Sequence, residues 1–186
     1  MFVKEIKNRW ALIIIVTAIG LFLDILTKYL ADTKLTYAIP KVIFGDYLQL
    51  FLVYNKGAVF GMNPKDLFPG FPTHYFFMIF NSIATVLLIL YYKSLPKTER
   101  AMHWGIALII PGALGNLSDR FLHPSKGVVD FIKMGISEQH YWPIYNFADI
   151  YVTFGVIILM LCFLTEDKRR NTAKQVSVSK ESTPSV

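Results

Sequence analysis

Charged residues and cysteines are both scarce in this chain of 186 residues. Only 17% of the residues are charged and 54% are hydrophobic, and the mean hydropathy is +0.43. The apolar residues fall in long blocks, a pattern typical of membrane proteins and not of soluble domains. The single cysteine, Cys162, lies inside one of these blocks. It therefore excludes both an intrachain disulfide framework and a CxxC metal site.

Several sequence signatures of other functions are also missing. The net charge is +6, but the basic residues flank the apolar blocks instead of forming a stripe with interleaved aromatics. Anionic lipid headgroups and membrane topology account for this pattern better than nucleic acid does. No HExxH or GxSxG motif occurs and the four histidines are dispersed, which disfavours a metallopeptidase and a serine nucleophile. No small-x-small cleavage site follows the first apolar block, so we interpret that block as a retained anchor.

Four apolar segments are each long enough to cross a bilayer, which takes about 20 helical residues. They cover residues 10–30, 75–92, 101–120 and 144–165. Basic residues gather before the first segment, between the second and third, and after the fourth. The positive-inside rule then places both termini in the cytoplasm and both long connections outside.

The first outer connection has the composition of a small sheet. Residues 36–62 are rich in β-branched and aromatic side chains and are punctuated by turn residues, which predicts two or three short strands. Residues 171–186 are rich in Ser, Lys and Thr without apolar periodicity, so we expect a disordered cytoplasmic tail. The predicted fold is a mainly α membrane protein in which residues 1–170 form one domain. Its four transmembrane helices carry a small extracytoplasmic β-sheet after the first helix.

Polar residues from four separate segments converge at one depth in this topology. Ionisable side chains inside a bilayer are costly and usually serve a function. The converging residues lie at the outer ends of the spans or in the connection before the fourth span, and comprise Asp24, Lys28, Asn116, Asp119, Arg120, Asp130, Asn146 and Asp149.

Asp130 and Asp149 are the two acids best suited to catalysis. Asp130 lies in the apolar sequence GVVDFI, and Asp149 lies in the first turns of an apolar helix. Burial and mutual repulsion disfavour ionisation of both, so two such acids can share one proton. One then acts as a base toward water while the other donates a proton to the scissile carbonyl or the leaving amine. The residues alone leave an alternative open, with Asp149 as a helix N-terminal charge and Asp130 as a turn residue.

Two i, i+4 pairs accompany these acids. Asp24 and Lys28 can form an ion pair on one helix face, or can anchor the interface through a snorkelling lysine. Asn116 and Arg120 can serve the site, or can make interhelical hydrogen bonds and headgroup contacts. Gly112, on the same segment, allows another helix to approach closely.

Five motifs of the chain resemble those of the lipoprotein signal peptidases, the signal peptidase II family. They are DILTK (24–28), YNKGAVFG (54–61), PGALGNLSDR (111–120), VVDF (128–131) and YNFAD (145–149), in the same order and spacing. The resemblance implies that Asp130 and Asp149 are a catalytic aspartyl dyad that needs no metal or other cofactor. It implies a supporting site formed by Asp24, Lys28, Asn55, Gly57, Gly112, Asn116, Asp119, Arg120, Asn146 and Ala148, and an outer β-cradle after the first helix.

The resemblance also implies a substrate and a location. Members of this family remove the signal peptide from diacylglyceryl-prolipoproteins, cutting just before the lipid-modified cysteine. We therefore expect a multi-pass enzyme of the bacterial inner membrane, monomeric and surrounded by lipids, with its site near the outer face.

Two alternatives from other functional classes stay open on the residues alone. A proton-linked carrier would use Asp24, Asp119 and Asp149, and would have polar groups distributed through the depth of the membrane. A lipid-binding scaffold with the same fold would be expected to lack one of the two dyad acids, and both are present.

Overall fold

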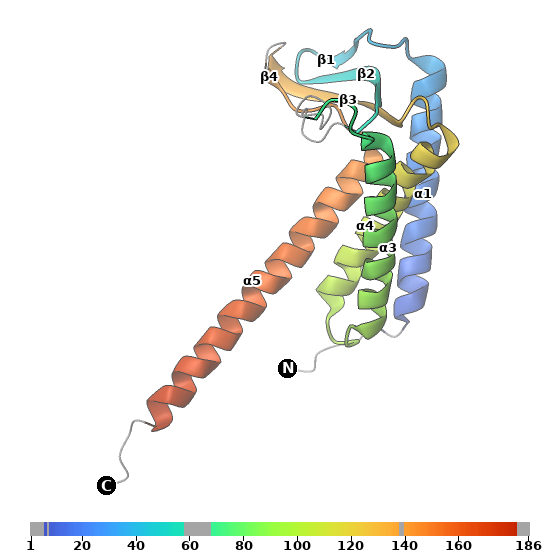
Figure 1. The fold of residues 1–186 in the computed structure, drawn as a ribbon. Helices are drawn as coiled ribbons and strands as arrows, with labels where there is room; N and C mark the ends of the chain where they lie inside the picture. Colours follow the sequence, from blue (N-terminus) through green and yellow to red (C-terminus); the bar gives the residue numbers. More distant parts are fainter. Residues whose placement is uncertain (1–5, 7, 58–67, 138–139, 182–186) are drawn as a thin grey trace.

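The computed structural model describes residues 6, 8–57, 68–137 and 140–181, the last sixteen of these as backbone only. In these residues, long helices stand side by side and a small sheet lies across one end of them (Figure 1). The helices are α1 (Arg9–Lys34), α3 (Thr73–Ser94), α4 (Arg100–Leu122) and α5 (Phe147–Glu181). The first residues of α1 and the last of α5 lie at the end away from the sheet (Figure 1).

Each predicted span overlaps one of these helices. Three helical segments are long and apolar enough to cross a membrane among the described residues, namely α1, α3 and residues Phe147–Thr165 of α5. Helix α4, which we expected as the third span, is not among them. It differs because it is the central helix of the bundle, in contact with α1, α3 and α5. A helix enclosed by protein has less need of a uniformly apolar surface.

Close contact between α4 and α5 depends on glycine. A Cβ atom on Gly155 would lie 2.5 Å from the carbonyl oxygen of Gly105 and 2.5 Å from Cγ1 of Ile109. The missing side chains therefore let the two helix backbones touch, as small residues commonly do between membrane helices. Beyond this contact, α5 leaves the bundle at an angle (Figure 1).

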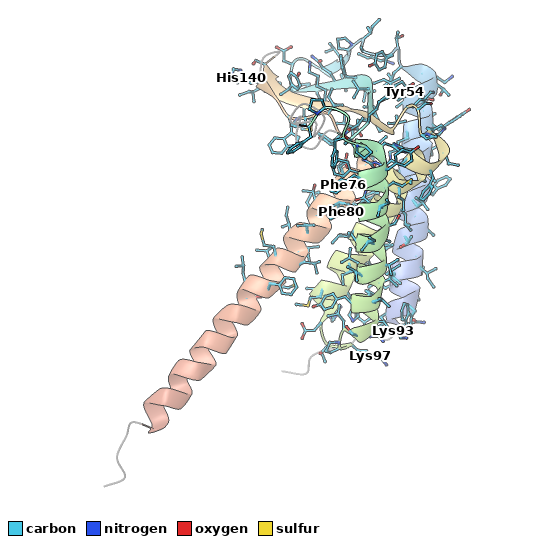
Figure 2. All side chains as sticks on the ribbon, in the orientation of Figure 1. Tyr54, Phe76, Phe80, Lys93, Lys97 and His140 are labelled. Carbon is cyan, nitrogen blue, oxygen red and sulfur yellow. The ribbon has the colours of Figure 1, made fainter. Side chains whose placement is uncertain are left out.

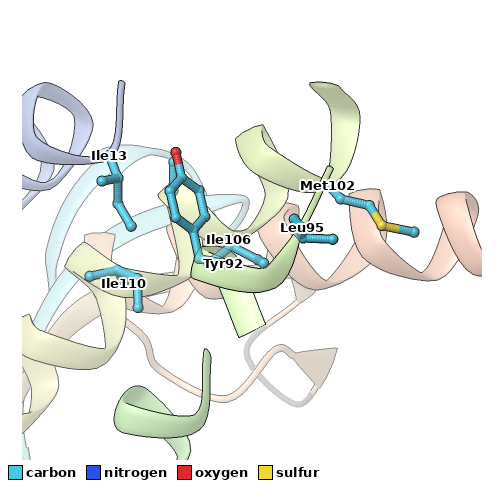
Figure 3. Close-up of a cluster of buried hydrophobic side chains, with 7 residues drawn as sticks. Ile13, Tyr92, Leu95, Met102, Ile106 and Ile110 are labelled. Carbon is cyan, nitrogen blue, oxygen red and sulfur yellow. The ribbon is translucent and has the colours of Figure 1, made fainter. Parts of the chain in front are cut away.

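An apolar cluster closes the bundle at the end away from the sheet. The side chains of Ile13, Tyr92, Leu95, Met102, Ile106 and Ile110 meet there from α1, α3, α4 and the turn after α3 (Figure 3). The hydroxyl of Tyr92 donates to the backbone oxygen of Arg9, and Arg9 Nη1 donates to the oxygen of Leu95 at 2.7 Å. These bonds satisfy polar groups that would otherwise be buried without partners.

Large apolar side chains also cover the outside of the helices. Ile14, Phe22 and Leu87 are each about 60% exposed, and the rings of Phe76 and Phe80 point outward from α3 (Figure 2). Soluble monomers rarely expose apolar patches of this extent. The outer surface of the helices is therefore suited to lipid contact.

The sheet has four antiparallel strands in chain order. They are β1 (Lys41–Phe44), β2 (Leu48–Asn55), β3 (Val128–Ser137) and β4 (His140–Tyr141). Strands β1 and β2 confirm the sheet predicted for the first outer connection, whose residues 58–62 lie outside the described residues. Strands β3 and β4, which we did not predict, join the same sheet from the connection before α5. As a result Asp130 lies on a strand, directly opposite Val53.

The chain after the fourth apolar segment differs from expectation. We expected disorder from residue 171, but α5 continues to Glu181. No glycine or proline occurs between Thr165 and Pro184, so nothing in the sequence interrupts the helix. Its 35 residues span about 52 Å at the usual rise, well beyond the bilayer core of about 30 Å.

A substitution at the α4–α5 contact tests this packing. We expect Gly155→Val to lower the free energy of unfolding by about 1–3 kcal/mol, because the new methyl groups force the two backbones apart. Thr153→Val is the matched control, since Thr153 is exposed two residues away and should leave stability unchanged. Unfolding followed by circular dichroism in detergent measures both, and equal stability of the two variants would contradict the close contact.

Candidate active site

The start of α5 carries the first acid of the site. Asn146 precedes the helix, and its side-chain oxygen accepts from the backbone N–H of Asp149 at 3.1 Å. In return, the backbone N–H of Asn146 donates to Asp149 Oδ2 at 3.1 Å. This reciprocal pair is a capping box, which satisfies two N–H groups that the helix itself leaves free. Asp149 is thereby fixed in the first turn of α5.

The same asparagine also holds the second acid. Asn146 Nδ2 donates to Asp130 Oδ1 at 2.7 Å, and Asn55 Nδ2 donates to Asp130 Oδ2 at 3.0 Å. Asp130 is therefore gripped from β2 on one oxygen and from the α5 cap on the other. Because Asn146 contacts both acids, the structure brings together the two carboxyl groups that the sequence singled out.

Asn116 of α4 completes the frame around Asp149. Its Nδ2 donates to Asp149 Oδ1 at 2.8 Å. Its Oδ1 accepts from Lys28 Nζ and from Asn146 Nδ2, each at 3.0 Å. Two donors on the oxygen leave the amide nitrogen facing the carboxylate, so the orientation of the Asn116 amide is determined by its neighbours.

Lys28 connects α1 to all of these groups. Besides Asn116, its Nζ contacts Asp24 Oδ2 at 2.7 Å and Asp119 Oδ2 at 3.1 Å. Lys28 is only 3% exposed and Asp24 is fully buried. A buried ammonium is stable only when its N–H bonds have acceptors and its charge is compensated, and here three acceptors supply both.

The carboxylates of Asp24 and Asp119, which contact Lys28, also accept hydrogen bonds from the backbone next to Asp149 and Asp130. Asp24 Oδ1 accepts from the N–H of Ala148 at 2.9 Å, one residue before Asp149. Asp119 Oδ2 accepts from the N–H of Val129 at 3.1 Å, one residue before Asp130. The network thus positions both acids through backbone and through side chains.

Burial decides the protonation of Asp130. Its side chain is 2% exposed. Burial first, and the Asp149 carboxylate second, raise the pKa of Asp130 to about 7, although Asn55, Lys28 and Asn146 stabilise the charged form. At neutral pH this carboxyl group can therefore hold a proton or release one, which is the property needed for acid–base work.

The remaining predicted residues lie at the edges of this network. Arg120 is buried, donates from Nη1 to the backbone oxygen of Asn116 at 3.1 Å, and has its guanidinium carbon 5.8 Å from the centre of the Phe77 ring. Gly57 has φ +127°, and a Cβ there would collide with Thr73. A Cβ on Gly112 would collide with the backbone oxygen of Ala148. These glycines are therefore required for close approach.

Two contributors were not among the predicted site residues. A Cβ on Gly115 would collide with the Asp24 carboxylate, so Gly115 makes room for the buried ion pair. Its position one residue before Asn116 was a usable signal. Val129 contributes its backbone N–H to Asp119 and its oxygen to Asn146, and no side-chain pattern reveals a backbone role.

The candidate metal ligands do not gather. Among the residues that the structure describes, no group of three or more His, Cys, Asp and Glu side chains is placed to hold a metal ion. His103 is buried in α4, with Nε2 3.2 Å from the oxygen of Pro96. The sequence-based expectation that no metal or cofactor is needed stays a prediction.

Comparison with known proteins identifies the family to which the chain belongs. The family model described as Signal peptidase (SPase) II matches residues 16–165. The chain belongs to the signal peptidase II family. Among curated members, it is 32% identical to the lipoprotein signal peptidase of Clostridium tetani, over 83% of this chain and 93% of that protein. It is 36% identical to that of Francisella tularensis subsp. novicida, over 78% of this chain and 87% of that protein.

Solved structures of bacterial membrane enzymes share the fold of this signal peptidase II. One superposes with a TM-score of 0.76 at 27% identity, covering 89% of this chain and 95% of the other. A second gives 0.73 at 25% identity, covering 88% and 98%. The chain is therefore a bacterial membrane protein of a peptidase family, and the recognition from its five motifs is confirmed.

Lys28 offers a direct test of the buried network. We expect Lys28→Met to lower the free energy of unfolding by about 3–5 kcal/mol, because it leaves Asp24 and Asp119 buried without their counter-ion. The double variant with Asp24→Asn should recover part of this loss. Lys34→Met, at the exposed end of the same helix, is the control. Chemical unfolding in detergent measures the series, and a Lys28→Met protein as stable as the control would contradict the network.

Proposed function

We propose that this signal peptidase II is an aspartyl endopeptidase that removes the signal peptide from diacylglyceryl-prolipoproteins, cutting just before the lipid-modified cysteine. The observation that carries the proposal is the contact of one residue, Asn146, with the carboxyl groups of both Asp130 and Asp149. The curated relatives, named lipoprotein signal peptidases, support the substrate class.

The chemistry follows from the different surroundings of the two acids. Asp130, with its pKa raised to about 7, starts as the protonated member and donates to the scissile carbonyl oxygen. Asp149, held by Asn116 and the backbone of Asn146, removes a proton from the attacking water. The hydroxyl adds to the carbonyl carbon and forms a gem-diol. As the C–N bond breaks and the C=O bond re-forms, Asp149 gives its proton to the cysteine nitrogen and Asp130 takes back a proton from the diol, which restores both acids.

The reaction needs no metal or other cofactor in this proposal, because two carboxyl groups supply both proton transfers. Asn55 and Asn146 keep the Asp130 carboxyl group oriented. The dyad is supported from α1 and α4 by charged side chains, namely Asp24, Lys28, Asp119 and Arg120. A preorganised polar site of this kind stabilises developing charge without rearrangement.

The membrane arrangement fits a lipid-bearing substrate. We propose that α4 also spans the membrane, enclosed by the three more apolar helices, and that the chain crosses the bacterial inner membrane with both termini in the cytoplasm. Lys93 and Lys97 lie at the end of the bundle away from the sheet (Figure 2), which supports this orientation. The dyad then lies near the outer face, where a diacylated cysteine is held by the membrane. One domain, acting as a monomer among lipids, contains the whole site.

The competing carrier interpretation loses support from the distribution of polar groups. A proton route through the membrane would need polar side chains at the cytoplasmic end of the helices. That end is filled mainly by the apolar cluster around Ile106 and Ile110 (Figure 3), and its buried Tyr92 hydroxyl and His103 ring are held by backbone oxygens. The buried ionic network stays at the end next to the sheet.

Exchange of each dyad acid tests the proposed function. We expect Asp130→Asn and Asp149→Asn each to reduce cleavage of a lipidated prolipoprotein by about a thousandfold or more, since each removes a proton transfer. The assay is a gel shift with purified enzyme in lipid. Asp46→Asn, in the exposed β1–β2 turn, is the matched control. Retained cleavage by either dyad variant, or activity lost to a chelator and restored by a divalent metal, would contradict the proposal.

The pH profile tests the assignment of Asp130 as the acid. Its raised pKa means that the protonated form is present below about 7 and is lost as the pH rises through that value. We therefore expect the cleavage rate to fall on the alkaline side with a midpoint at about pH 7. Initial rates between about pH 5 and 9 measure this, under conditions where the enzyme stays folded. A rate that stays constant across that range would exclude the assignment.

A further inference from the structure

A second polar cluster lies outside the candidate active site, where α1, β2 and the α4–β3 connection meet. It consists of Asp32, Tyr54 and Lys126. We propose that these three are positioning residues, which clamp the end of β2 so that the Asn55 amide stays on Asp130. The inference rests on the proposed function only for its catalytic consequence, because the clamp itself is a matter of contacts.

The contacts join three parts of the chain at one point. The hydroxyl of Tyr54 donates to Asp32 Oδ1, and Lys126 Nζ lies 3.4 Å from Asp32 Oδ2. The same ammonium lies 5.1 Å from the centre of the Tyr54 ring. Tyr37 stacks on the Tyr54 ring at 5.5 Å between centres. Tyr54 lies where the sheet meets the helices (Figure 2), so its ring is held from several sides.

The clamp acts where β2 is weakest. Asn55 is the last residue of β2 and pairs with Val128 at the end of the ladder. Terminal pairs of a sheet open more easily than internal ones. Successive side chains of a strand point to opposite faces, so Tyr54 and Asn55 make their contacts on opposite sides of β2. Tyr54 faces Asp32 and Lys126 while Asn55 faces Asp130, so holding the Tyr54 side chain also restricts rotation of the strand at Asn55.

The Lys126 connection reinforces the same end of the strand. Gly127, next to Lys126, has φ +88°, and a Cβ there would collide with the backbone oxygen of Asn55. The connection therefore lies directly against the backbone of the residue that the clamp positions. An isolated surface ion pair contributes little, but a hydroxyl bond, an ion pair, a ring stack and a backbone contact at one strand end act together.

The clamp keeps its charges through the neutral range. The contact with Asp32 raises the pKa of Lys126 and that of the Tyr54 hydroxyl, so both stay protonated there. The charged groups that act on Asp130 are Asp149 from α5, Lys28 from α1 and Arg120 from α4. The clamp variants remove none of these, so a change in the Asp130 titration reports the Asn55 contact.

The test removes one hydroxyl group. Tyr54→Phe should lower kcat about three- to tenfold, on the scale of one typical intramolecular hydrogen bond, with little change in KM. It should also move the alkaline limb of the pH profile above about 7, because the Asn55 hydrogen bond lowers the pKa of Asp130. Asp32→Ala, which removes the acceptor of the same bond, should reproduce both effects.

An infrared titration provides a readout that does not need activity. The carboxyl C=O stretch of Asp130 is identified by its loss in Asp130→Asn, and its midpoint should rise in Tyr54→Phe. Tyr29→Phe, an exposed tyrosine on α1, is the control and should leave the midpoint and kcat unchanged.

The outcomes are separable. An Asp130 midpoint that does not move in either clamp variant overturns the clamp, whatever happens to the rate. A wild-type enzyme that fails to cleave a lipidated prolipoprotein, but whose Asp130 midpoint moves in Tyr54→Phe, overturns the proposed function and leaves the clamp standing.

Discussion

The Lys28 ammonium contacts three side-chain oxygens, and each belongs to a different branch of the site. Withdrawing an ammonium from water is costly unless its charge and its donors are both satisfied. The arrangement is therefore stable only when α1 lies against α4, with Asp24 and Asp119 in place. Because those two carboxylates also hold the start of α5 and of β3, the position of the dyad depends on this one contact.

Two chemically identical side chains acquire different environments in this frame. Asp130 is carried by a strand and is enclosed on all sides, which favours its neutral form. Asp149 lies in the first turn of a helix and accepts hydrogen bonds from Asn116 and Asn146. Such a difference in surroundings is how a site assigns separate acid and base roles to a pair of carboxyl groups. Asn146 donates hydrogen bonds to both carboxyl groups and therefore takes part in both environments.

The sequence predicted the parts of this molecule that follow from local chemistry. Long apolar blocks predicted the helices, and turn residues in 36–62 predicted β1 and β2. Strand β3 was missed because GVVDFI is buried on both faces, so it lacks the alternation by which a strand is recognised. The clamp was missed because Asp32 and Lys126 are 94 residues apart and no local pattern connects them. Glu181 ends a helix that composition alone did not predict.

The capping box at Asn146 has a consequence for biogenesis. The residue that caps the last helix also contacts the carboxyl groups of both acids, so the proposed catalytic pair is assembled only when α5 packs against the rest of the bundle. A nascent chain with only its first three helices in the bilayer has Asp130 without this bridge and has no Asp149. Under the proposed mechanism, the enzyme therefore gains its activity only once α5 has joined the bundle.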